Sequence, residues 1–393
     1  MIEGHGDDIY RYDELVKMNF SSNIFQHADH SALKAHLAEH LDLINNYPAP
    51  RPRRLEKLIA QKEGIVPEAV MVTNGSTEAI YLIAQLFHHS ASIIPQPTYS
   101  EYADACRIFD HIISYENTDD LTSLPADRVY WICNPNNPSG NVLMKGFVDY
   151  IVRRSPRYTF VVDQSYETYT REHLLSARET MGLPNLFILH SLSKTYAVPG
   201  LRLGYVTAAP SLIEMLRSLR QPWTVNALAI EAGVFLLEHG QPAIPNLTTY
   251  LEETERLRQA LRNIEGIRVF ETKTNYMLCE ISPTPASKLK DYLIHEHGIL
   301  IRDCSNFYGL SNHFFRVSAQ KPEENDALIE AIKEFMNRHA DKQWHGRPRQ
   351  ESEDRHRHRH GHERPGTSDH GVEGRHDHHE GHDGGGFGLL YLS

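Results

Sequence analysis

The sequence predicts an α/β protein whose large domain holds a mainly parallel β-sheet between layers of helices, with a smaller α+β domain after it. Near-continuous apolar runs of strand length recur in the middle of the chain, as in RVYWIC, TFVVD and LFILH. Helical patterns separate these runs, and strands without a polar face are typical of parallel sheets that are covered on both sides. From Ile267 onward, shorter strands and helices alternate again, which indicates the smaller domain.

Length and composition agree with this organisation. The chain has 393 residues, of which 40% are hydrophobic, and this is enough for a large core. Near His339 the apolar pattern stops, and the residues that follow could not bury enough area to offset the entropy of ordering them. We therefore expect an N-terminal arm that contributes to the small domain (1–45), a large domain (46–245), a small C-terminal domain (246–340) and a disordered tail (341–393).

Charge and cysteine content exclude several classes of protein. The formal net charge of −11, with no dominant basic face, argues against nucleic acid as a partner. The 4 cysteines are widely spaced, without a C-x-x-C pattern, as is typical of reduced thiols in the cytosol. No apolar signal segment follows Met1, and no stretch reaches ~18 uninterrupted apolar residues. We expect a soluble cytoplasmic protein with no membrane segment.

The first strand of the predicted sheet, at 69–75, runs directly into a helix that begins with the letters STEAI. Gly75 permits the tight turn between them. Ser76 and Thr77 then open the helix, whose free N–H groups suit a phosphate. Because serine and threonine are also common helix caps, this motif alone leaves both interpretations open.

Two later strands also end in polar residues, which is where an open α/β sheet binds its ligands. In NPNNPSG, Asn137 either presents its amide to a ligand oxygen or closes a turn on its own backbone. Asp163 ends a fully apolar strand, where a carboxylate is costly unless a positive group meets it. A protonated ring nitrogen of a ligand could be that group; an arginine partner or a helix cap is the alternative.

The stretch SLSKTYAVPGLRLGY places Lys194 between apolar residues, after a serine-rich turn. A lysine in such a setting can act as a nucleophile that forms a Schiff base with an aldehyde. Arg202, with the hydroxyls of Ser191 and Ser193, would hold a phosphate beside it. An isolated lysine of this kind is more often structural. Together with Asp163, however, the set matches a cofactor with an aldehyde, a ring nitrogen and a phosphate, which is pyridoxal phosphate.

The chain resembles fold-type I pyridoxal-phosphate enzymes of the aminotransferase family over about residues 1–338. The motifs that carry the resemblance occur in the family's order: NGSTEAI, PTYSEY, NPNNPSG, DQSYETY, SLSKTYAVPGLRLGY and FRVSA. The lysine motif with its downstream arginine is the most specific of them. The resemblance implies the three-layer fold of this family, with a mainly parallel sheet in the large domain, and an enzyme that uses pyridoxal phosphate.

The resemblance also implies a role for each matching residue. Lys194 would hold the cofactor aldehyde and carry protons, and Asp163 would pair with the ring nitrogen. Arg316 would bind the substrate carboxylate. Tyr47 would reach the cofactor phosphate of the neighbouring subunit, which implies a homodimer. The remaining cofactor contacts would come from Tyr99, Asn137 and Tyr166 at the ring, and from Gly75, Ser76, Thr77, Ser191, Ser193 and Arg202 at the phosphate.

Within the family, the chain is similar to the branch that contains histidinol-phosphate aminotransferases and L-threonine-O-3-phosphate decarboxylases. Three stretches, GHGDDIYRY, NFSSNIF and QPWTVNALA, resemble the decarboxylases of cobalamin biosynthesis. In that group a histidine and an asparagine near the N-terminus bind the substrate phosphate, which implies this role for His5 and Asn23. A capping or surface role is the alternative, and Asp7 stands where the decarboxylases carry a glycine.

The resemblance therefore implies decarboxylation of L-threonine-O-3-phosphate to (R)-1-amino-2-propanol phosphate, with amino-group transfer to 2-oxoglutarate as the alternative. The two reactions differ in which bond at the α-carbon lies perpendicular to the cofactor ring, and a sequence pattern does not reveal this. A ligand-sensing domain of a regulator is a third interpretation. We disfavour it because Lys194 and Asp163 are intact and no DNA-binding module is recognisable.

Histidines recur between Arg355 and His382 at spacings of one or two residues. Neutral imidazoles on a flexible chain can bind nickel, cobalt or zinc loosely. The alternative is that this segment is solvated and binds no ligand. The candidate metal ligands are His356, His358, His360, His376, His378 and His379.

Overall fold

The computed structural model describes residues 7–12, 14–115, 128–244 and 246–345, and side chains as far as Arg338. The described residues up to Met336 belong to one compact unit, and a second unit begins at Asn337. All sheets and the candidate site lie in the first unit. The boundaries expected near residues 45, 245 and 340 stay predictions, and the histidine-rich segment from residue 346 lies outside the described residues.

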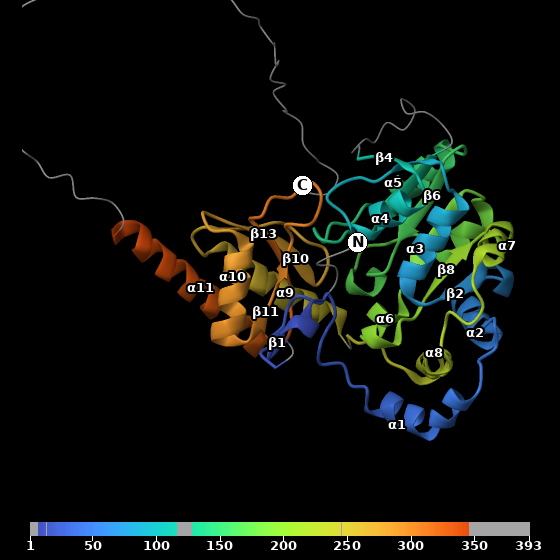
Figure 1. The fold of residues 1–393 in the computed structure, drawn as a ribbon, viewed down its shortest axis with the longest axis horizontal. Coiled ribbons are helices and arrows are strands. Elements are labelled where there is room, and N and C mark those ends of the chain that lie inside the picture. The colour runs from blue at the N-terminus through green and yellow to red at the C-terminus, as the bar shows by residue number, and fades with distance from the viewer. Residues whose placement is uncertain (1–6, 13, 116–127, 245, 346–393) are drawn as a thin grey trace, which may run out of the picture. The chain divides into compact units, whose positions relative to one another are not determined.

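A seven-stranded sheet forms the centre of this unit (Figure 1). Its strand order is β2-β8-β7-β6-β5-β3-β4, and every strand except β8 runs in the same direction. This confirms the mainly parallel sheet expected from the apolar runs. The strands are β2 (Val70–Thr73), β3 (Ala91–Ile93), β4 (Ile112–Ser114), β5 (Arg128–Cys133), β6 (Thr159–Asp163), β7 (Leu186–His190) and β8 (Gly204–Ala208).

Helices cover both faces of the large sheet because successive residues of each strand point to opposite sides. In β5, Val129 and Trp131 pack in one apolar cluster, whereas Tyr130 and Ile132 pack in another on the opposite face. The first face is covered by α3 (Gly75–Leu86), α4 (Glu101–Ile108) and α7 (Pro210–Leu219). The other is covered by α2 (Arg53–Glu63), α5 (Lys145–Arg154), α6 (Leu192–Thr195) and α8 (Ala227–His239), with α1 (Ser31–Glu39) against α8.

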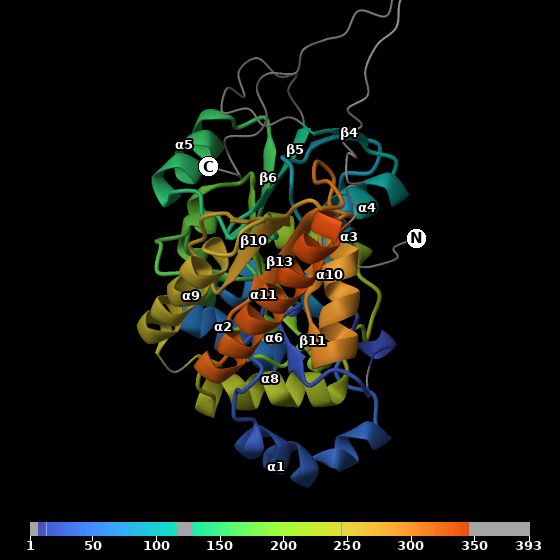
Figure 2. The ribbon, with the colours of Figure 1, turned by 90° about the vertical axis from the view of Figure 1, so that its left-hand side faces the viewer.

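A second, antiparallel sheet follows in the chain, with the order β12-β13-β10-β9. Its apolar core is shared with three helices (Figure 2), as expected for the α+β part of the sequence. The elements are α9 (Leu247–Arg262), β9 (Ile267–Val269), β10 (Tyr276–Ile281), α10 (Ala286–Tyr292), β12 (Arg302–Asp303), β13 (Phe314–Ser318) and α11 (Pro322–His345).

A short parallel pair joins the N-terminal segment to this second sheet region. Strand β1 (Met18–Asn19) pairs with β11 (Ile299–Leu300), and the Phe20 amide continues the ladder to the Leu300 carbonyl. Residues 20–23 are thereby held next to the strand that leads into Arg302. No helix within the described ranges is both long and apolar enough to cross a bilayer.

Candidate active site

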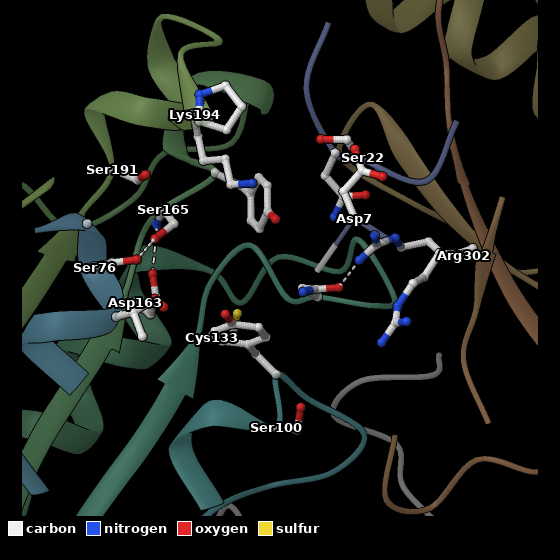
Figure 3. A pocket seen from close by; sticks show the side chains of 18 of the residues that line it. Asp7, Ser22, Ser76, Ser100, Cys133, Asp163, Ser165, Ser191, Lys194 and Arg302 are labelled. Carbon is white, nitrogen blue, oxygen red and sulfur yellow. Dashed lines mark hydrogen bonds between the residues drawn. The ribbon is translucent and has the colours of Figure 1, made fainter. Parts of the chain in front are cut away.

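A cavity of about 370 Å³ opens where four parallel strands of the large sheet end. Its lining residues follow the carboxyl ends of β2, β5, β6 and β7, and Arg202 precedes the antiparallel strand β8. The opposite side comes from residues 7 and 21–23 and from the second sheet (Figure 3). Twelve residues expected at the site line this one cavity: Asn23, Gly75, Ser76, Thr77, Tyr99, Asn137, Asp163, Tyr166, Ser191, Lys194, Arg202 and Arg316.

Lys194 reaches the cavity from α6, a single helical turn that follows β7. Its Nζ lies 5.6 Å from the centre of the Tyr166 ring. The Tyr169 hydroxyl donates a hydrogen bond of 2.8 Å to the Lys194 carbonyl, which fixes the backbone of this turn. The amine therefore sits on a well-supported turn and faces the open part of the site (Figure 3).

Asp163 is a carboxylate that lies 4% exposed at the end of β6. The Tyr102 hydroxyl donates to Oδ2 at 2.8 Å, and the Ser165 amide donates to Oδ1 at 2.9 Å. Burial raises the pKa of this carboxyl, although the bonds from Ser165 and Tyr102 act in the opposite direction. Among the described residues no lysine or arginine forms an ion pair with Asp163, so a cationic ligand atom would complete this position.

The helix start after β2 forms a cup with Arg202. Gly75 has a φ of +73°, which favours glycine, and a Cβ added to it would lie 2.6 Å from Nη2 of Arg202. The Ser165 hydroxyl donates to that of Ser76 at 3.2 Å. Gly75, Ser76 and Thr77 start the twelve-residue helix α3. Its first N–H groups, the serine hydroxyls and a guanidinium together suit a phosphate.

Arg316 connects the two sides of the cavity. Its Nη1 donates to the Asn137 side-chain oxygen, and its Nη2 donates to the Ser21 carbonyl at 2.6 Å. The two amide hydrogens of Asn137 thus stay available as donors. The Nε of Arg316, the Ser21 hydroxyl and both amide atoms of Asn23 are buried and have no hydrogen-bond partner within the described part of the chain. Buried polar groups without partners are costly, so these atoms favour the binding of a polar ligand on this side of the cavity.

Arg302 is a site residue that the sequence analysis missed. It stands directly opposite Arg316 in the β12–β13 pair, is 5% exposed, and lines the same cavity. Its Nη2 donates to the Asn306 side-chain oxygen at 2.9 Å, and burial lowers the pKa of the guanidinium. Neither arginine forms an ion pair with a carboxylate in the described ranges. In the sequence, Arg302 directly follows the apolar run GILI, and a charged residue in this position is the pattern that could have indicated it.

Other lining residues were also missed, among them Tyr102, Ser165 and Cys133. Tyr102, in the first turn of α4, comes three residues after Tyr99, and the two rings meet edge to face at 5.6 Å. Burial raises the pKa of the Tyr99 hydroxyl, and burial together with Asp163 raises that of the Cys133 thiol to about 12. Both groups are therefore neutral at physiological pH, and Asp163 is the titratable acid next to them.

Two described residues from the predicted cofactor set, Ser193 and Tyr47, do not line the cavity of this chain. The Ser193 hydroxyl points toward β8 instead, where it donates to the Leu203 carbonyl at 3.2 Å and accepts from the Leu203 amide at 3.0 Å. Tyr47 is 86% exposed and packs near Trp223, with 5.4 Å between ring centres. His5 and the six tail histidines lie outside the described residues.

Pyridoxal phosphate fits the residues that are present. The buried carboxylate of Asp163 has no lysine or arginine partner in the described ranges and would meet a protonated ring nitrogen. The close approach of Gly75 to Arg202 leaves a cup in which a side chain would clash. Lys194 lies in the same cavity as these two features, so it could hold the aldehyde carbon.

Comparison with known proteins agrees with this geometry. The family model described as aminotransferase class I and II matches residues 16–332. A protein of Caldanaerobacter subterraneus subsp. tengcongensis, provisionally named threonine-phosphate decarboxylase, is 30% identical over 310 residues, or 74% of this chain and 83% of that protein. A histidinol-phosphate aminotransferase of Thermoanaerobacter pseudethanolicus is 30% identical over 309 residues, or 75% of this chain and 85% of that protein.

A solved structure is similar as well. The crystal structure of L-threonine-O-3-phosphate decarboxylase from Porphyromonas gingivalis superimposes with a TM-score of 0.78 at 35% identity, and covers 81% of this chain and 99% of that one. The family match over residues 16–332 includes the strands of both sheets.

Proposed function

The chain belongs to the class I and II aminotransferase family, and from this premise we propose that it decarboxylates L-threonine-O-3-phosphate to (R)-1-amino-2-propanol phosphate. It is a pyridoxal-phosphate-dependent enzyme. The 35% identity to a decarboxylase of solved structure supports the more specific assignment. A cytoplasmic location and a place in cobalamin biosynthesis, which the sequence analysis expected, stay predictions.

The observation that carries the proposal is the pair of buried arginines in the cavity. Arg302 and Arg316 lie opposite each other without carboxylate partners among the described residues. Two buried guanidinium groups that form no ion pair in the described ranges favour two anionic groups on the ligand. L-threonine-O-3-phosphate supplies a carboxylate and a phosphate. We assign the carboxylate to Arg316, and the phosphate to Arg302 with Asn23 and His5.

The cofactor contacts follow the sequence predictions with one change. We propose that Lys194 holds the cofactor aldehyde and Asp163 its ring nitrogen, with Tyr99 against the ring face. Asn137 and Tyr166 would donate to the ring oxygen. The phosphate cup consists of Gly75, Ser76, Thr77, Ser191 and Arg202, whereas Ser193 supports the cup through its bonds to Leu203.

When bound, pyridoxal phosphate supplies an electron-withdrawing ring that stabilises negative charge on the substrate α-carbon. Asp163 keeps the ring nitrogen positively charged, because its own charge is buried and otherwise unpaired. Arg316 and Arg302 fix the two anionic ends of the substrate, and so determine which bond at the α-carbon is broken. The carbon–carbon bond breaks and CO2 leaves. Lys194 then delivers a proton to the electron pair that stays on the α-carbon.

The region around Tyr47 supports a homodimer. Apolar side chains stand exposed on residues 41–47 and nearby: Leu41, Leu43, Ile44, Tyr47 and Trp223. Clustered exposed apolar residues mark contact surfaces. We propose that a second copy of the chain covers this surface, and that Tyr47 reaches the cofactor phosphate of that copy. Sedimentation should give the mass of two chains, and Tyr47→Phe should weaken cofactor binding without changing that mass.

The reaction is tested on one purified sample of the holoenzyme. The sample is incubated with L-threonine-O-3-phosphate while CO2 is followed, and then with histidinol phosphate plus 2-oxoglutarate while glutamate is followed. Release of CO2 without glutamate is the expected result. Glutamate without CO2 would establish the aminotransferase alternative, which the 30% identity to a histidinol-phosphate aminotransferase favours.

A further inference from the structure

A cluster of two histidines and a glutamate lies apart from the cavity, where α1 packs against α8 (Figures 1 and 2). We propose that His36, His40 and Glu231 form a binding site for one divalent transition-metal ion such as Zn²⁺ or Co²⁺. None of the three residues lines the active-site cavity. None of the three residues belongs to the histidine-rich segment from residue 346, and the site does not depend on the proposed reaction.

Helical spacing brings the three side chains together. His36 and His40 are four residues apart at the end of α1, and such residues share one face of a helix. On α8, Glu231 and Phe235 are likewise four residues apart. The two faces meet: the His36 ring stacks on Phe235 at 4.5 Å, and the His36 and His40 rings lie 4.2 Å apart. Both histidines are thus held in place by neighbouring rings.

The donor atoms are close enough to share an ion. One donor atom from each of the three residues lies within 4.8 Å of the other two. Bonds of about 2.0 Å to a tetrahedral ion place ligand atoms about 3.3 Å apart. Side-chain rotations that shorten these separations by at most about 1.5 Å therefore close the site. Two imidazole nitrogens and a carboxylate oxygen are a donor set typical of zinc and cobalt.

The hydrogen bonds of the cluster resemble those around metal ligands. His40 Nδ1 lies 2.7 Å from the His36 carbonyl, which only accepts, so this nitrogen carries the proton. The other nitrogen of a neutral His40 ring then offers its lone pair, in the way that metal-bound histidines are oriented by a carbonyl. His36 Nε2 lies 2.9 Å from a Glu231 oxygen. An ion would take the place of the proton between these two groups.

The surrounding charges permit a cation. Arg54 is the positive group nearest to Glu231, with Nη1 3.9 Å from Oε2. It is 63% exposed and also approaches Glu238 at 3.5 Å, so it can keep that partner when an ion binds. The side chains of His36 and Glu231 are 22% and 17% exposed, which leaves a path for entry and a position for water. The ion would tie α1 to α8.

The test compares full-length holoenzyme variants by thermal unfolding with Zn²⁺ and by the visible absorption of added Co²⁺. Wild type should gain about 4 °C in Tm when Zn²⁺ is present at about a hundredfold excess over its dissociation constant. His36→Gln and His40→Gln should gain less than about 1 °C. His239→Gln is the matched control, because it removes a 63% exposed histidine of α8, the helix that carries Glu231, outside the cluster, and should behave as wild type.

Because the sequence analysis predicts loose metal binding by the tail histidines, a further variant replaces His356, His358, His360, His376, His378 and His379 with glutamine. This variant should keep the full rise in Tm. If His36→Gln does not fold, Glu231→Gln takes its place, because an amide preserves a hydrogen bond to His36. The proposal is overturned if the cluster variants gain as much Tm as wild type, or if wild type gains none and its Co²⁺ absorption equals that of the cluster variants.

Discussion

The two sides of the active-site cavity satisfy their polar groups in different ways. On the sheet side, the Asp163 carboxylate accepts hydrogen bonds from Tyr102 and Ser165, and the Lys194 turn is held by Tyr169. On the opposite side, both amide atoms of Asn23 and the Nε of Arg316 are buried without partners among the described residues. We call the first the cofactor side and the second the substrate side.

This difference is expected if the cofactor binds on the first side and the substrate on the second, as we propose. A cofactor stays bound through many turnovers, so its contacts gain from a shell of hydrogen bonds that already hold them in place. A substrate must enter and leave. Polar groups that have no partner until it binds discriminate most strongly against molecules that lack the matching group. Changes on the cofactor side should therefore affect the rate of the chemical step, whereas changes on the substrate side should affect substrate affinity.

The largest effect is expected for Lys194→Ala on the cofactor side. Because we propose that this amine moves the proton at the α-carbon, its loss should lower kcat about 10⁴-fold, while the Kd for substrate changes little. Single-turnover assays of CO2 release, with substrate binding followed by cofactor absorbance, measure both quantities. Lys62→Ala is the control, since Lys62 lies on α2 near Tyr196 and outside the cavity. An equal loss of binding and rate would contradict the division into two sides.

A smaller effect, in KM, is expected for Arg302→Lys and Arg316→Lys on the substrate side. Lysine keeps the charge but loses the planar fork that binds an anion through two bonds. Each change should lower kcat/KM about 10- to 100-fold, mostly through KM. Arg268→Lys is the matched control, because Arg268 is 71% exposed on β9 and outside the cavity. If Arg302→Lys kept the KM of wild type, the substrate phosphate would have to bind elsewhere.

The two sides also differed in how far the sequence could predict them. Asp163 and Lys194 follow apolar strands that are continuous in the chain, so a local pattern indicates each of them. Parallel strands then bring their carboxyl ends to one edge, which is why separate motifs converge. The direction of Ser193 differed, because a single helical turn rotates its side chain toward Leu203 and away from Ser191. Tyr102, Ser165 and Cys133 of the same side were missed.

The substrate side depends on pairing between distant segments. Strand β1 pairs with β11, which sets residues 21–23 beside the strand before Arg302, about 280 positions later in the chain. The β12–β13 register then places Arg302 opposite Arg316. No local periodicity encodes either pairing. Asn23 and Arg316 were therefore predicted through a family resemblance, and Arg302, which no quoted motif contains, was missed.

A third test separates stability from binding at Asn23. Its amide is buried without partners, so its removal eliminates an unsatisfied group but leaves a small cavity. Asn23→Ala should change the free energy of unfolding by less than about 1 kcal/mol and raise KM about tenfold. Asn275→Ala is a suitable comparison, because that asparagine is also buried with an unpaired oxygen but does not line the cavity. A KM unchanged by Asn23→Ala would leave this amide without a substrate role.

The smallest effect concerns Asp163 and pH. Burial raises the pKa of this carboxyl above its ordinary 3.8, so the folded protein without cofactor keeps a proton that the unfolded chain has lost. The folded state then binds more protons, and the free energy of unfolding falls as pH rises from about 3.8 to the raised pKa, by at most about 1.4 kcal/mol per pH unit. Urea unfolding of the cofactor-free protein across this range should show the decrease, and Asp163→Asn should lack it.

With cofactor bound, a positive ring nitrogen favours the ionised carboxylate, so the wild-type protein should no longer show this decrease in the free energy of unfolding. A decrease of equal size in both forms would mean that Asp163 does not meet the cofactor.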